Sequence, residues 1–474
     1  MSGERAVRAV RPVAGPLDAT ARVPGSKSVT NRALVCAALA PGRSVLTDAL
    51  FADDTEAMLE GLRALGTRIE ADRAAATVAV TGPPVPPAGE VVEIDARLSG
   101  TTARFLLPVV ALGPGRYRLD GAPPLRARPM ADGLAAVRSL GAEVVEGGEP
   151  GHFPVTVTGV GVGLGAGGKA EDEAGGRREV VVGGAASSQF LSGLLLSGPA
   201  WPGGLRVVTP GRLVSRPYVD MTLAVMRAFG AEVRAADATD ATDVSDAGAA
   251  PVDRGSGAPD APPAAGGWIV EPGGYHPTTY AVEPDASAAS YFFAAAAICG
   301  GRVTVEGLGA GSLQGDLAFV DVLARMGCRV HKGETATTVE ATGPLRGVDV
   351  DMGALSDTAQ TLAAVAVFAE GPTRLRGIGF IRHKETDRVG NVVRELRRCG
   401  VDAVEEPDGF VVRPGTPHGA RIETYDDHRM AMSFALLGLR TPGIEITDPG
   451  CVAKTFPGFW DALDALAGSR PRVQ

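Results

Sequence analysis

The sequence predicts a mixed α/β protein built from six copies of one structural unit. Each copy has a polar or acidic start, an apolar helix rich in Ala and Leu, a turn with Gly or Pro, and a short strand with β-branched residues. Alternating helices and strands are typical of the α/β class, and self-similarity along a chain indicates a repeat architecture. The copies begin at Ser26, Ser99, Ser187, Asp285, Asp357 and Asp427.

A second helix, again followed by a strand, recurs between these copies. Five of these helices end at a glycine, the residue that most readily adopts the left-handed conformation that closes a helix. The glycines are Gly66, Gly141, Gly230, Gly327 and Gly400. A sixth helix, FWDALDALAG, comes near the end of the chain without a strand after it. Six units therefore account for nearly the whole sequence.

The composition is that of an acidic, soluble protein. The 474 residues include 46 Lys and Arg against 55 Asp and Glu, a net charge of −9, and only 5% are aromatic. An acidic chain with few aromatic residues is not expected to bind nucleic acid. The first residues lack the apolar run of a signal peptide, and no stretch approaches the ~18 apolar residues of a membrane span. We therefore expect a cytoplasmic protein with no membrane partner.

The five cysteines form no CxxC pair and lie mostly in apolar surroundings. Buried free thiols are common in reducing compartments, so we expect reduced core cysteines. They are Cys36, Cys299, Cys328, Cys399 and Cys451.

Two stretches interrupt the repeat. Residues 159–177 have Gly-x-Gly spacing without the strand and helix that a dinucleotide loop needs. Residues 235–267 contain six Asp and one Arg among Ala, Gly and Pro, a composition that cannot form a packed core. We predict that both are mobile surface insertions, peripheral to the chemistry.

Charged residues gather beside small polar ones in five short segments, most of them just before or within the start of a helix. Each segment alone is explained by ordinary helix capping or by a solvated charged helix start, such as one in which Lys384 and Arg388 share a face. Helix N-termini with free N–H groups also bind anions. If the units pack around a pseudo-symmetry axis, these starts would converge on one anion-binding pocket. The segments are residues 24–32, 125–130, 383–388, 424–432 and 453–457.

Together with Ser187-Ser188-Gln189 and residues 213–218, these segments resemble the 5-enolpyruvylshikimate-3-phosphate (EPSP) synthase family. The similarity runs from about residue 10 to residue 465, apart from the insertions, and includes PGSKSVTNRAL, KETDR, TYDDHRMAM and AKTFP in the family's order. The resemblance implies a two-domain inside-out α/β barrel with three βαβαββ units and a pseudo-threefold axis in each domain. One domain would comprise residues 1–22 plus 280–474, the other residues 23–279, with chain crossings near residues 22–24 and 277–280.

The resemblance also implies the reaction. The enolpyruvyl group of phosphoenolpyruvate would pass to the 5-hydroxyl of shikimate 3-phosphate, releasing phosphate, in a monomer that uses no metal or organic cofactor. The residues that would bind shikimate 3-phosphate are Lys27, Ser28, Arg32, Ser187, Ser188, Gln189, Ser215, Tyr218, Asp357 and Lys384. The residues that would bind phosphoenolpyruvate are Lys27, Gly100, Arg128, Gln189, Arg388, Arg429 and Lys454.

The addition–elimination mechanism needs proton transfer to and from two groups that flank the reacting carbons. Asp357 and Glu385 match the family positions for this role, and Lys27 is a third candidate. Neighbouring cations would lower the pKa of these carboxyls, whereas desolvation would raise it, and the sequence leaves both outcomes open. Arg104 and His428 match the family too, but each could simply hold neighbouring side chains.

The chain departs from the family pattern at Leu98, where Asn is common, and at Phe105, where Pro is common. Loss of the Asn amide puts the affinity for phosphoenolpyruvate in question. Three alternative functions remain: the sister enzyme that uses UDP-N-acetylglucosamine, a paralogue that acts on another phosphorylated acceptor such as a nucleotide, and a non-catalytic relative. The first generally has a Cys in the loop that here reads GAPPLRARPM, and the matched Asp357, Glu385 and Lys27 argue against the last.

Overall fold

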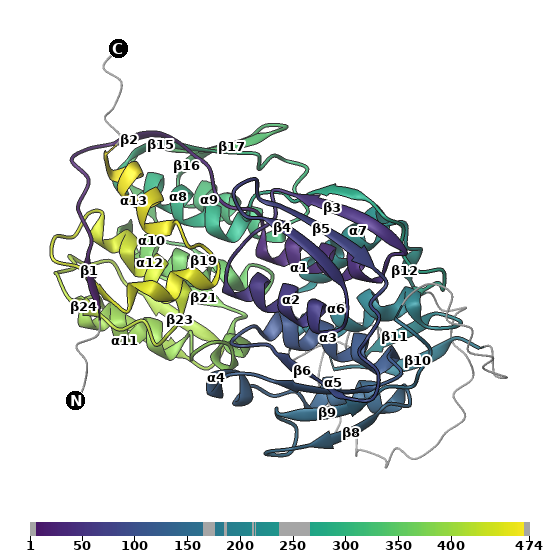
Figure 1. The fold of residues 1–474 in the computed structure, drawn as a ribbon. Coiled ribbons are helices and arrows are strands. Elements are labelled where there is room, and N and C mark those ends of the chain that lie inside the picture. Colours follow the sequence, from purple (N-terminus) through teal and green to yellow (C-terminus); the bar gives the residue numbers. More distant parts are fainter. Residues whose placement is uncertain are drawn as a thin grey trace.

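Sheets of four strands recur along the chain, each paired with helices that pack on one side of it (Figure 1). The computed structural model describes residues 6–164, 176–183, 187–210, 213, 215–236 and 266–468. In each four-stranded sheet the first and second strands of the unit pair in parallel, and the fourth strand pairs antiparallel with the second and the third. The mixed α/β class is confirmed.

The buried apolar side chains of the described residues form two separate cores. One core draws on residues 29–282, which we call the middle lobe, and the other on residues 10–23 and 286–466, which we call the terminal lobe. The domain bounds expected from the sequence, residues 1–22 plus 280–474 and residues 23–279, stay a prediction beside these two cores. Tyr280 and Val282 pack with the middle lobe, so the second crossing lies just after them.

The middle lobe contains three units. The first comprises β14 (Thr279–Ala281), α1 (Lys27–Leu39), β3 (Gly42–Thr47), α2 (Asp53–Ala64), β4 (Arg68–Asp72) and β5 (Thr77–Gly82). The second comprises β6 (Val91–Asp95), α3 (Gly100–Leu112), β7 (Arg116–Asp120), α4 (Pro123–Arg126), α5 (Ala131–Ser139), β8 (Glu143–Glu146) and β9 (Val155–Thr158). The third comprises β10 (Arg178–Val181), α6 (Ser188–Ser197), η1 (Gly198–Ala200), β11 (Leu205–Thr209), α7 (Arg216–Ala228), β12 (Val233–Ala235) and β13 (Gly266–Val270).

The terminal lobe contains the other three units. The fourth comprises β2 (Leu17–Ala21), α8 (Ala286–Cys299), β15 (Gly301–Glu306), η3 (Gly315–Ala318), α9 (Phe319–Arg325), β16 (Cys328–Lys332) and β17 (Ala336–Ala341). The fifth comprises β19 (Asp349–Asp351), η4 (Ser356–Thr358), α10 (Ala359–Ala366), β21 (Thr373–Arg376), η5 (Gly379–His383), α11 (Gly390–Arg398), β22 (Ala403–Glu406) and β23 (Gly409–Val412), with the short pair β18 (Leu345–Arg346) and β20 (Ala369–Glu370). The sixth comprises β24 (Arg421–Ile422), α12 (His428–Gly438), β25 (Glu445–Thr447), η6 (Pro449–Lys454) and α13 (Phe459–Gly468), and β1 (Val7–Ala9) completes its three-stranded sheet.

Each lobe includes one strand that directly precedes the first helix of the other lobe in the chain. β2, near the N-terminus, pairs in parallel with β15 of the terminal lobe, and β14 pairs in parallel with β3 of the middle lobe (Figure 1). The chain therefore crosses between the lobes twice, and the crossings are joined by backbone hydrogen bonds from Ser26 to Glu283 and from Asp285 to Pro24. This pairing fixes the starts of α1 and α8 beside each other.

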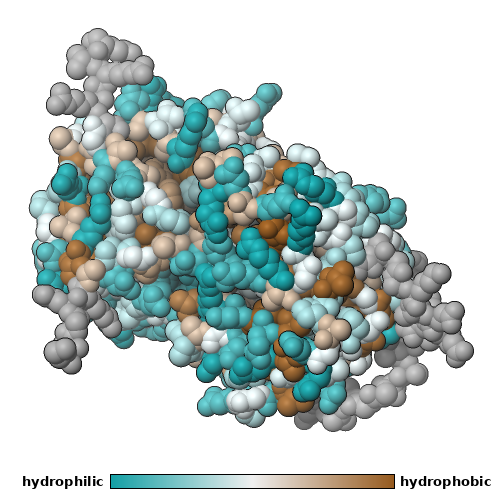
Figure 2. Space-filling model, in the orientation of Figure 1, coloured by the Kyte–Doolittle hydropathy of each residue, from teal (hydrophilic) through white to brown (hydrophobic). Residues whose placement is uncertain are grey.

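The first helix of each unit lies inside its lobe and the sheets lie outside. α1, α3 and α6 pack together in the middle lobe, and α8, α10 and α12 pack together in the terminal lobe. These helices are apolar nearly all round, and such helices are stable only when surrounded by other elements. Their Ala- and Leu-rich sequences thus account for the inside-out arrangement. Hydrophilic residues predominate on the outer face drawn in Figure 2, with hydrophobic ones scattered among them.

Five of the six predicted helix starts are N-caps. The side chains of Ser26, Ser99, Ser187, Asp285 and Asp427 each accept a hydrogen bond from a backbone N–H of the first helical turn. The sixth start differs, because α10 begins at Ala359 and Asp357 lies in η4 before it. The carboxylate of Asp357 is therefore not used as a cap.

The five predicted helix-closing glycines all have positive φ, from +78° at Gly400 to +111° at Gly327. The cysteines are free thiols, three of them buried and two, Cys299 and Cys451, half-buried. Residues 165–175 and 237–265 of the two insertions lie outside the described residues, so their mobility stays a prediction. Among the described helices, none has both the length and the apolar character needed to span a bilayer.

Candidate active site

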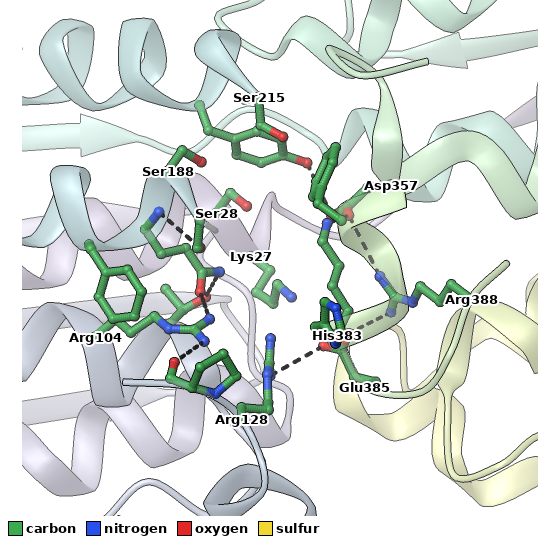
Figure 3. A pocket seen from close by; sticks show the side chains of 18 of the residues that line it. Lys27, Ser28, Arg104, Arg128, Ser188, Ser215, Asp357, His383, Glu385 and Arg388 are labelled. Atoms are coloured by element: carbon green, nitrogen blue, oxygen red, sulfur yellow. Dashed lines mark hydrogen bonds and ion pairs between the residues drawn. The ribbon is translucent and has the colours of Figure 1, made fainter. Parts of the chain in front are cut away.

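A cavity of about 160 Å³ lies between the lobes. Side chains from both lobes point into it, with Lys27 near its centre (Figure 3). Two carboxylates, Asp357 and Glu385, face a larger number of cations there. The cations are Lys27, Arg32, Arg104, Arg128, Lys384, Arg388 and Arg429. This excess of positive charge attracts multiply charged anions.

Four serines line the middle-lobe side of the cavity: Ser28, Ser187, Ser188 and Ser215. Ser28 and Ser188 belong to the first turns of α1 and α6. Ser215 precedes α7 with a left-handed backbone, φ +54°, and its hydroxyl lies 3.4 Å from the Gly353 carbonyl oxygen of the other lobe. Hydroxyls at the starts of α1, α6 and α7 thus line the same space, and helix N-termini favour a bound phosphate.

Arg32 is a buried cation without a carboxylate partner among the described residues. Its Nε donates to Thr222 Oγ1 at 2.8 Å and its Nη2 to the Tyr218 carbonyl oxygen at 3.1 Å. Its guanidinium also lies over the Phe105 ring, 5.1 Å from the centroid. Burial lowers the pKa of Arg32 to about 10, so an anionic ligand would relieve an unfavourable charge. Phe105, a departure from the family pattern, thus supports the arginine.

Arg104 and Gln189 form a second polar pair at the cavity wall. Arg104 Nη1 donates to Gln189 Oε1 at 2.7 Å, and Gln189 Nε2 donates to Thr101 Oγ1 at 3.1 Å. Burial, together with the nearby Arg128, holds the pKa of Arg104 well below its ordinary value. Arg104 thus both holds Gln189 and lines the cavity.

Asp357 is surrounded by cations of its own lobe. Its carboxylate lies 2.6 Å from Lys384 Nζ, 2.7 Å from Arg429 Nη2 and 3.7 Å from Arg388 Nη1. Burial alone would raise the pKa of Asp357, but these three cations hold it well below its ordinary value. The carboxylate is therefore ionised in the ligand-free site.

Glu385 meets cations of both lobes. Arg388 Nη2 lies 2.8 Å from its carboxylate, Lys454 Nζ 3.3 Å and Arg128 Nη1 3.9 Å. Burial again acts to raise the pKa of Glu385, and Arg388, Lys454 and Arg128 together bring it well below the ordinary value. The question that the sequence left open is thus answered for both carboxyls: attraction by the cations exceeds desolvation.

Lys454 and Gly100 lie beside the cavity rather than in its wall. Lys454 faces a smaller cavity of about 30 Å³ that shares Arg128 and Glu385 with the main one. Lys454 Nζ donates to the Leu98 carbonyl oxygen at 3.2 Å, a contact that any residue at position 98 could make. A Cβ on Gly100 would lie 2.7 Å from Arg128 Nη1, so the glycine leaves room for the arginine.

The segment from Lys384 to Arg388 is a turn between η5 and α11, not the helix start that the sequence suggested. Arg388 is held by the carboxylate of Asp427, which accepts from Nε at 2.7 Å and from Nη2 at 3.1 Å. Two such parallel hydrogen bonds fix the guanidinium plane. Asp427, the cap of α12, thereby orients a cavity cation.

Two buried carboxyls beside the cavity were not predicted from the sequence. Asp54, in the first turn of α2, lies 3.1 Å from Lys27 Nζ and 4.0 Å from Lys454 Nζ. Asp316, in η3, lies 3.0 Å from the Tyr218 hydroxyl. Both occur near the start of the second helix of a unit, so the pattern applied to the first helices would have found them.

His428 is buried and does not line the main cavity. Among the described residues neither ring nitrogen has a hydrogen-bond partner. Burial, with Arg429 and Lys454 nearby, holds the pKa of His428 well below its ordinary value. The imidazole is therefore neutral, which fits a supporting position better than proton transfer.

Six α/β units in two lobes, with a cation-lined cavity between them, define a two-lobed enzyme fold suited to anionic substrates. The model of the family described as EPSP synthase (3-phosphoshikimate 1-carboxyvinyltransferase) matches residues 13–251 and 260–463. The chain therefore belongs to the EPSP synthase family.

Individual relatives agree. A 3-phosphoshikimate 1-carboxyvinyltransferase of Trichormus variabilis is 41% identical over 454 residues, covering 96% of this chain and 97% of the relative. One of Nostoc punctiforme is 43% identical over 450 residues, covering 94% and 95%. The solved structure of EPSP synthase from Acinetobacter baumannii superposes with a TM-score of 0.74 at 25% identity, covering 97% of this chain and 98% of that one.

Proposed function

We propose that this member of the EPSP synthase family transfers the enolpyruvyl group of phosphoenolpyruvate to the 5-hydroxyl of shikimate 3-phosphate inside the cavity between the lobes. One observation carries the proposal: seven cations and two ionised carboxylates from both lobes face one enclosed space. Both substrates carry a phosphate and a carboxylate, and arginine binds such oxyanions through its fork of donors. The alternative acceptors and the non-catalytic alternative are not favoured by the whole-chain relatives.

Shikimate 3-phosphate would occupy the serine-lined side of the cavity. Its phosphate would lie against the serines Ser187, Ser188 and Ser215, with Lys384 opposite. Its carboxylate would lie near Ser28 and pair with Arg32, the buried arginine without a carboxylate partner among the described residues. Tyr218 and Gln189 border the same space.

Phosphoenolpyruvate would occupy the side that carries Arg128, Arg388, Arg429 and Lys454. Glu385 already contacts three of these cations. With phosphoenolpyruvate bound there, Glu385 would lie next to the methylene carbon that must be protonated. Asp357, which contacts Tyr218 and Lys384, would lie next to the acceptor hydroxyl.

The two carboxyls would exchange protons with the reacting atoms in both halves of the reaction. In the addition, Asp357 takes the proton of the 5-hydroxyl as its oxygen bonds to the central carbon of phosphoenolpyruvate, and Glu385 gives a proton to the methylene carbon. In the elimination, the bond to phosphate breaks, Asp357 gives the proton it took to the departing phosphate, and Glu385 removes a proton from the new methyl group. Lys27, at the centre of the cavity, is the third group within reach of these transfers.

Substrate binding would itself prepare the carboxyls for this role. The cations that hold the pKa values of Asp357 and Glu385 down would then also face the substrate phosphates and carboxylates. Added negative charge nearby raises the pKa of a carboxyl, which brings both groups closer to the range where general acids and bases work. Cations fixed in place before the reaction also stabilise the charge that develops in the transition state.

Phosphate release tests the proposal. The protein should release phosphate from phosphoenolpyruvate when shikimate 3-phosphate is present, and not when UMP or UDP-N-acetylglucosamine replaces it. Turnover only with UMP would indicate the paralogue, turnover only with UDP-N-acetylglucosamine the sister enzyme, and no turnover with any acceptor the non-catalytic relative. Each of these outcomes contradicts the proposal.

We also propose that the protein works as a monomer in the cytoplasm. The two lobes that line the cavity belong to the same chain, so the site can form within one copy. Five free cysteines are typical of a reducing compartment. Size-exclusion chromatography with light scattering should give a mass near that of one chain.

A further inference from the structure

The hydroxyl of Tyr218 lies between two buried carboxyl groups. Its oxygen is 3.0 Å from Asp316 Oδ2 and 3.1 Å from Asp357 Oδ2. Tyr218 belongs to α7 of the middle lobe, whereas Asp316 and Asp357 belong to η3 and η4 of the terminal lobe. The three groups therefore form a contact beside the cavity that joins the lobes.

The hydrogen bonds of this triad need a proton that ionised carboxylates do not supply. A phenol has one proton to donate, and an ionised carboxylate only accepts. Tyr218 can donate to only one of the two carboxylates. Its oxygen and the oxygen of the other carboxylate are then in contact with no proton between them. A proton on Asp316 resolves this, because Asp316 then donates to Tyr218 while Tyr218 donates to Asp357.

The surroundings of Asp316 favour that proton. Its exposed fraction is 4%, and its Oδ1 has no hydrogen-bond partner among the described residues. Oδ2 also accepts from the Ser287 hydroxyl of α8. The charged groups that act on Asp316 and Tyr218 are Asp357 of η4, Asp285 at the start of α8 and Arg429 of α12. Those that act on Asp357 are Arg429, Lys384, Arg388 and Lys27. Arg429 is already paired with Asp357, so Asp316 has no cation of its own among the residues that the structure describes.

Burial, and after it the charge of Asp357, raises the pKa of Asp316 to about 6. The cations around Asp357 act in the opposite direction on that group. Below about pH 6 the shared proton therefore belongs to Asp316, and above that pH Asp316 becomes ionised.

We propose that Asp316 is a positioning residue that determines whether the Tyr218 hydroxyl donates to Asp357. The inference rests on the proposed role of Asp357 as the group that takes the acceptor proton. When Asp316 is neutral, Tyr218 donates to Asp357 and makes that carboxylate a weaker base. When Asp316 is ionised, Tyr218 turns to Asp316. Asp357 then loses a hydrogen bond and faces a new negative charge, and both changes make it a stronger base.

The substitution Asp316→Asn tests this directly, because the amide keeps the shape and remains unable to ionise. It should hold Tyr218 in the orientation that neutral Asp316 gives. We expect kcat of the variant to match wild type at about pH 5 and to be lower by up to about tenfold at about pH 8, the largest effect that about one unit in the pKa of Asp357 can have on a general base. Substrate phosphates titrate in the same range, so the measured quantity is the wild-type to variant ratio of kcat, in which substrate ionisation cancels.

The control is Asp321→Asn on α9, an exposed carboxylate paired with Lys332. The wild-type to variant ratio of kcat for Asp321→Asn should stay constant with pH. A constant ratio for Asp316→Asn as well would overturn the inference while leaving the proposed function intact. Absence of turnover by the wild-type protein with phosphoenolpyruvate and shikimate 3-phosphate would instead contradict the proposed function.

Tyr218→Phe provides a second route that does not depend on Asp316→Asn folding. Without the hydroxyl, the charge of ionised Asp316 affects the basicity of Asp357 only by direct electrostatic repulsion. The change of kcat with pH should therefore be smaller than in wild type. The double variant Asp316→Asn/Tyr218→Phe should then differ little from Tyr218→Phe at any pH. Wild-type pH dependence in Tyr218→Phe would overturn the inference.

Discussion

Glu385 shows how a single side chain joins the two lobes, since Arg128 of the middle lobe and Arg388 and Lys454 of the terminal lobe all contact it. If it transfers protons, Glu385→Gln should lower kcat by a factor of about 10²–10⁴, the usual contribution of a general acid or base. The KM for phosphoenolpyruvate should not rise. The neutral amide offsets less of the positive charge of the neighbouring cations, which stays available to bind the anionic substrate. Steady-state phosphate release separates the two constants.

The matched control is Glu405→Gln, an exposed carboxylate of β22 that pairs with Arg382. It should leave both constants unchanged. A Glu385→Gln variant with wild-type kcat would show that Glu385 only positions the cations.

Gly100 tests the packing beneath the proposed phosphoenolpyruvate site. In Gly100→Ala the new Cβ would lie 2.7 Å from Arg128 Nη1 and 3.0 Å from its Cζ, so the guanidinium must move. We expect the KM for phosphoenolpyruvate to rise by about tenfold, equivalent to about 1.4 kcal/mol, with little change in the KM for shikimate 3-phosphate.

Gly343→Ala is the control for this substitution, because nothing lies within 4 Å of a Cβ built there. Equal increases in both KM values for Gly100→Ala would indicate a general distortion of the cavity and would contradict the assignment of this side to phosphoenolpyruvate.

At the scale of the elements, helix ends were the most predictable features. The five closing glycines have positive φ, and five of six polar helix starts are N-caps. Both depend on a few neighbouring residues, so the sequence shows them directly. Asp357 is the exception because its carboxylate pairs with Lys384 and Arg429, which are far from it in sequence.

Gly327 gives a clean test of a closing glycine, because φ is +111° and the nearest atom to an added Cβ is 3.5 Å away. Gly327→Ala should therefore destabilise the protein by about 1–2 kcal/mol through backbone strain alone. For a domain of this size the melting temperature should fall by about 2–4 °C per kcal/mol. Differential scanning calorimetry measures the shift.

Gly311→Ala, at an exposed turn with nothing within 4 Å, should leave the melting temperature unchanged. Activity per folded molecule should be unaffected in both variants, because neither glycine is near the cavity. An unshifted melting temperature for Gly327→Ala would show that the turn adapts to the side chain without strain.

For the whole molecule, the distribution of charge predicts movement of the lobes. Four of the cavity cations belong to the middle lobe and three to the terminal lobe, and like charges repel until anions lie between them. Shikimate 3-phosphate should therefore draw the lobes together about the two crossings, as hinge closure around a ligand does in other proteins. Small-angle scattering should show a smaller radius of gyration with shikimate 3-phosphate than without it.

Shikimate without its phosphate is the matched control ligand, and it should reduce the radius less. An unchanged radius with shikimate 3-phosphate would contradict closure. It would then follow that contacts such as that of Tyr218 with Asp316 hold the lobes together in the free protein as well.

The sequence by itself determined the six units, the ends of their helices and the clustering of cations at helix starts, because each depends on residues close together in the chain. Only the tertiary structure decided which charges meet. The pairing of β2 with β15 and of β14 with β3 brings the two lobes face to face. As a result, Glu385 lies beside Arg128. Tyr218 likewise lies between Asp316 and Asp357. Ion pairing and burial depend largely on groups that are not neighbours in the chain, such as Arg429 for Asp357 and Arg128 for Glu385. The low pKa values of Asp357 and Glu385 and the raised pKa of Asp316 therefore follow from the fold.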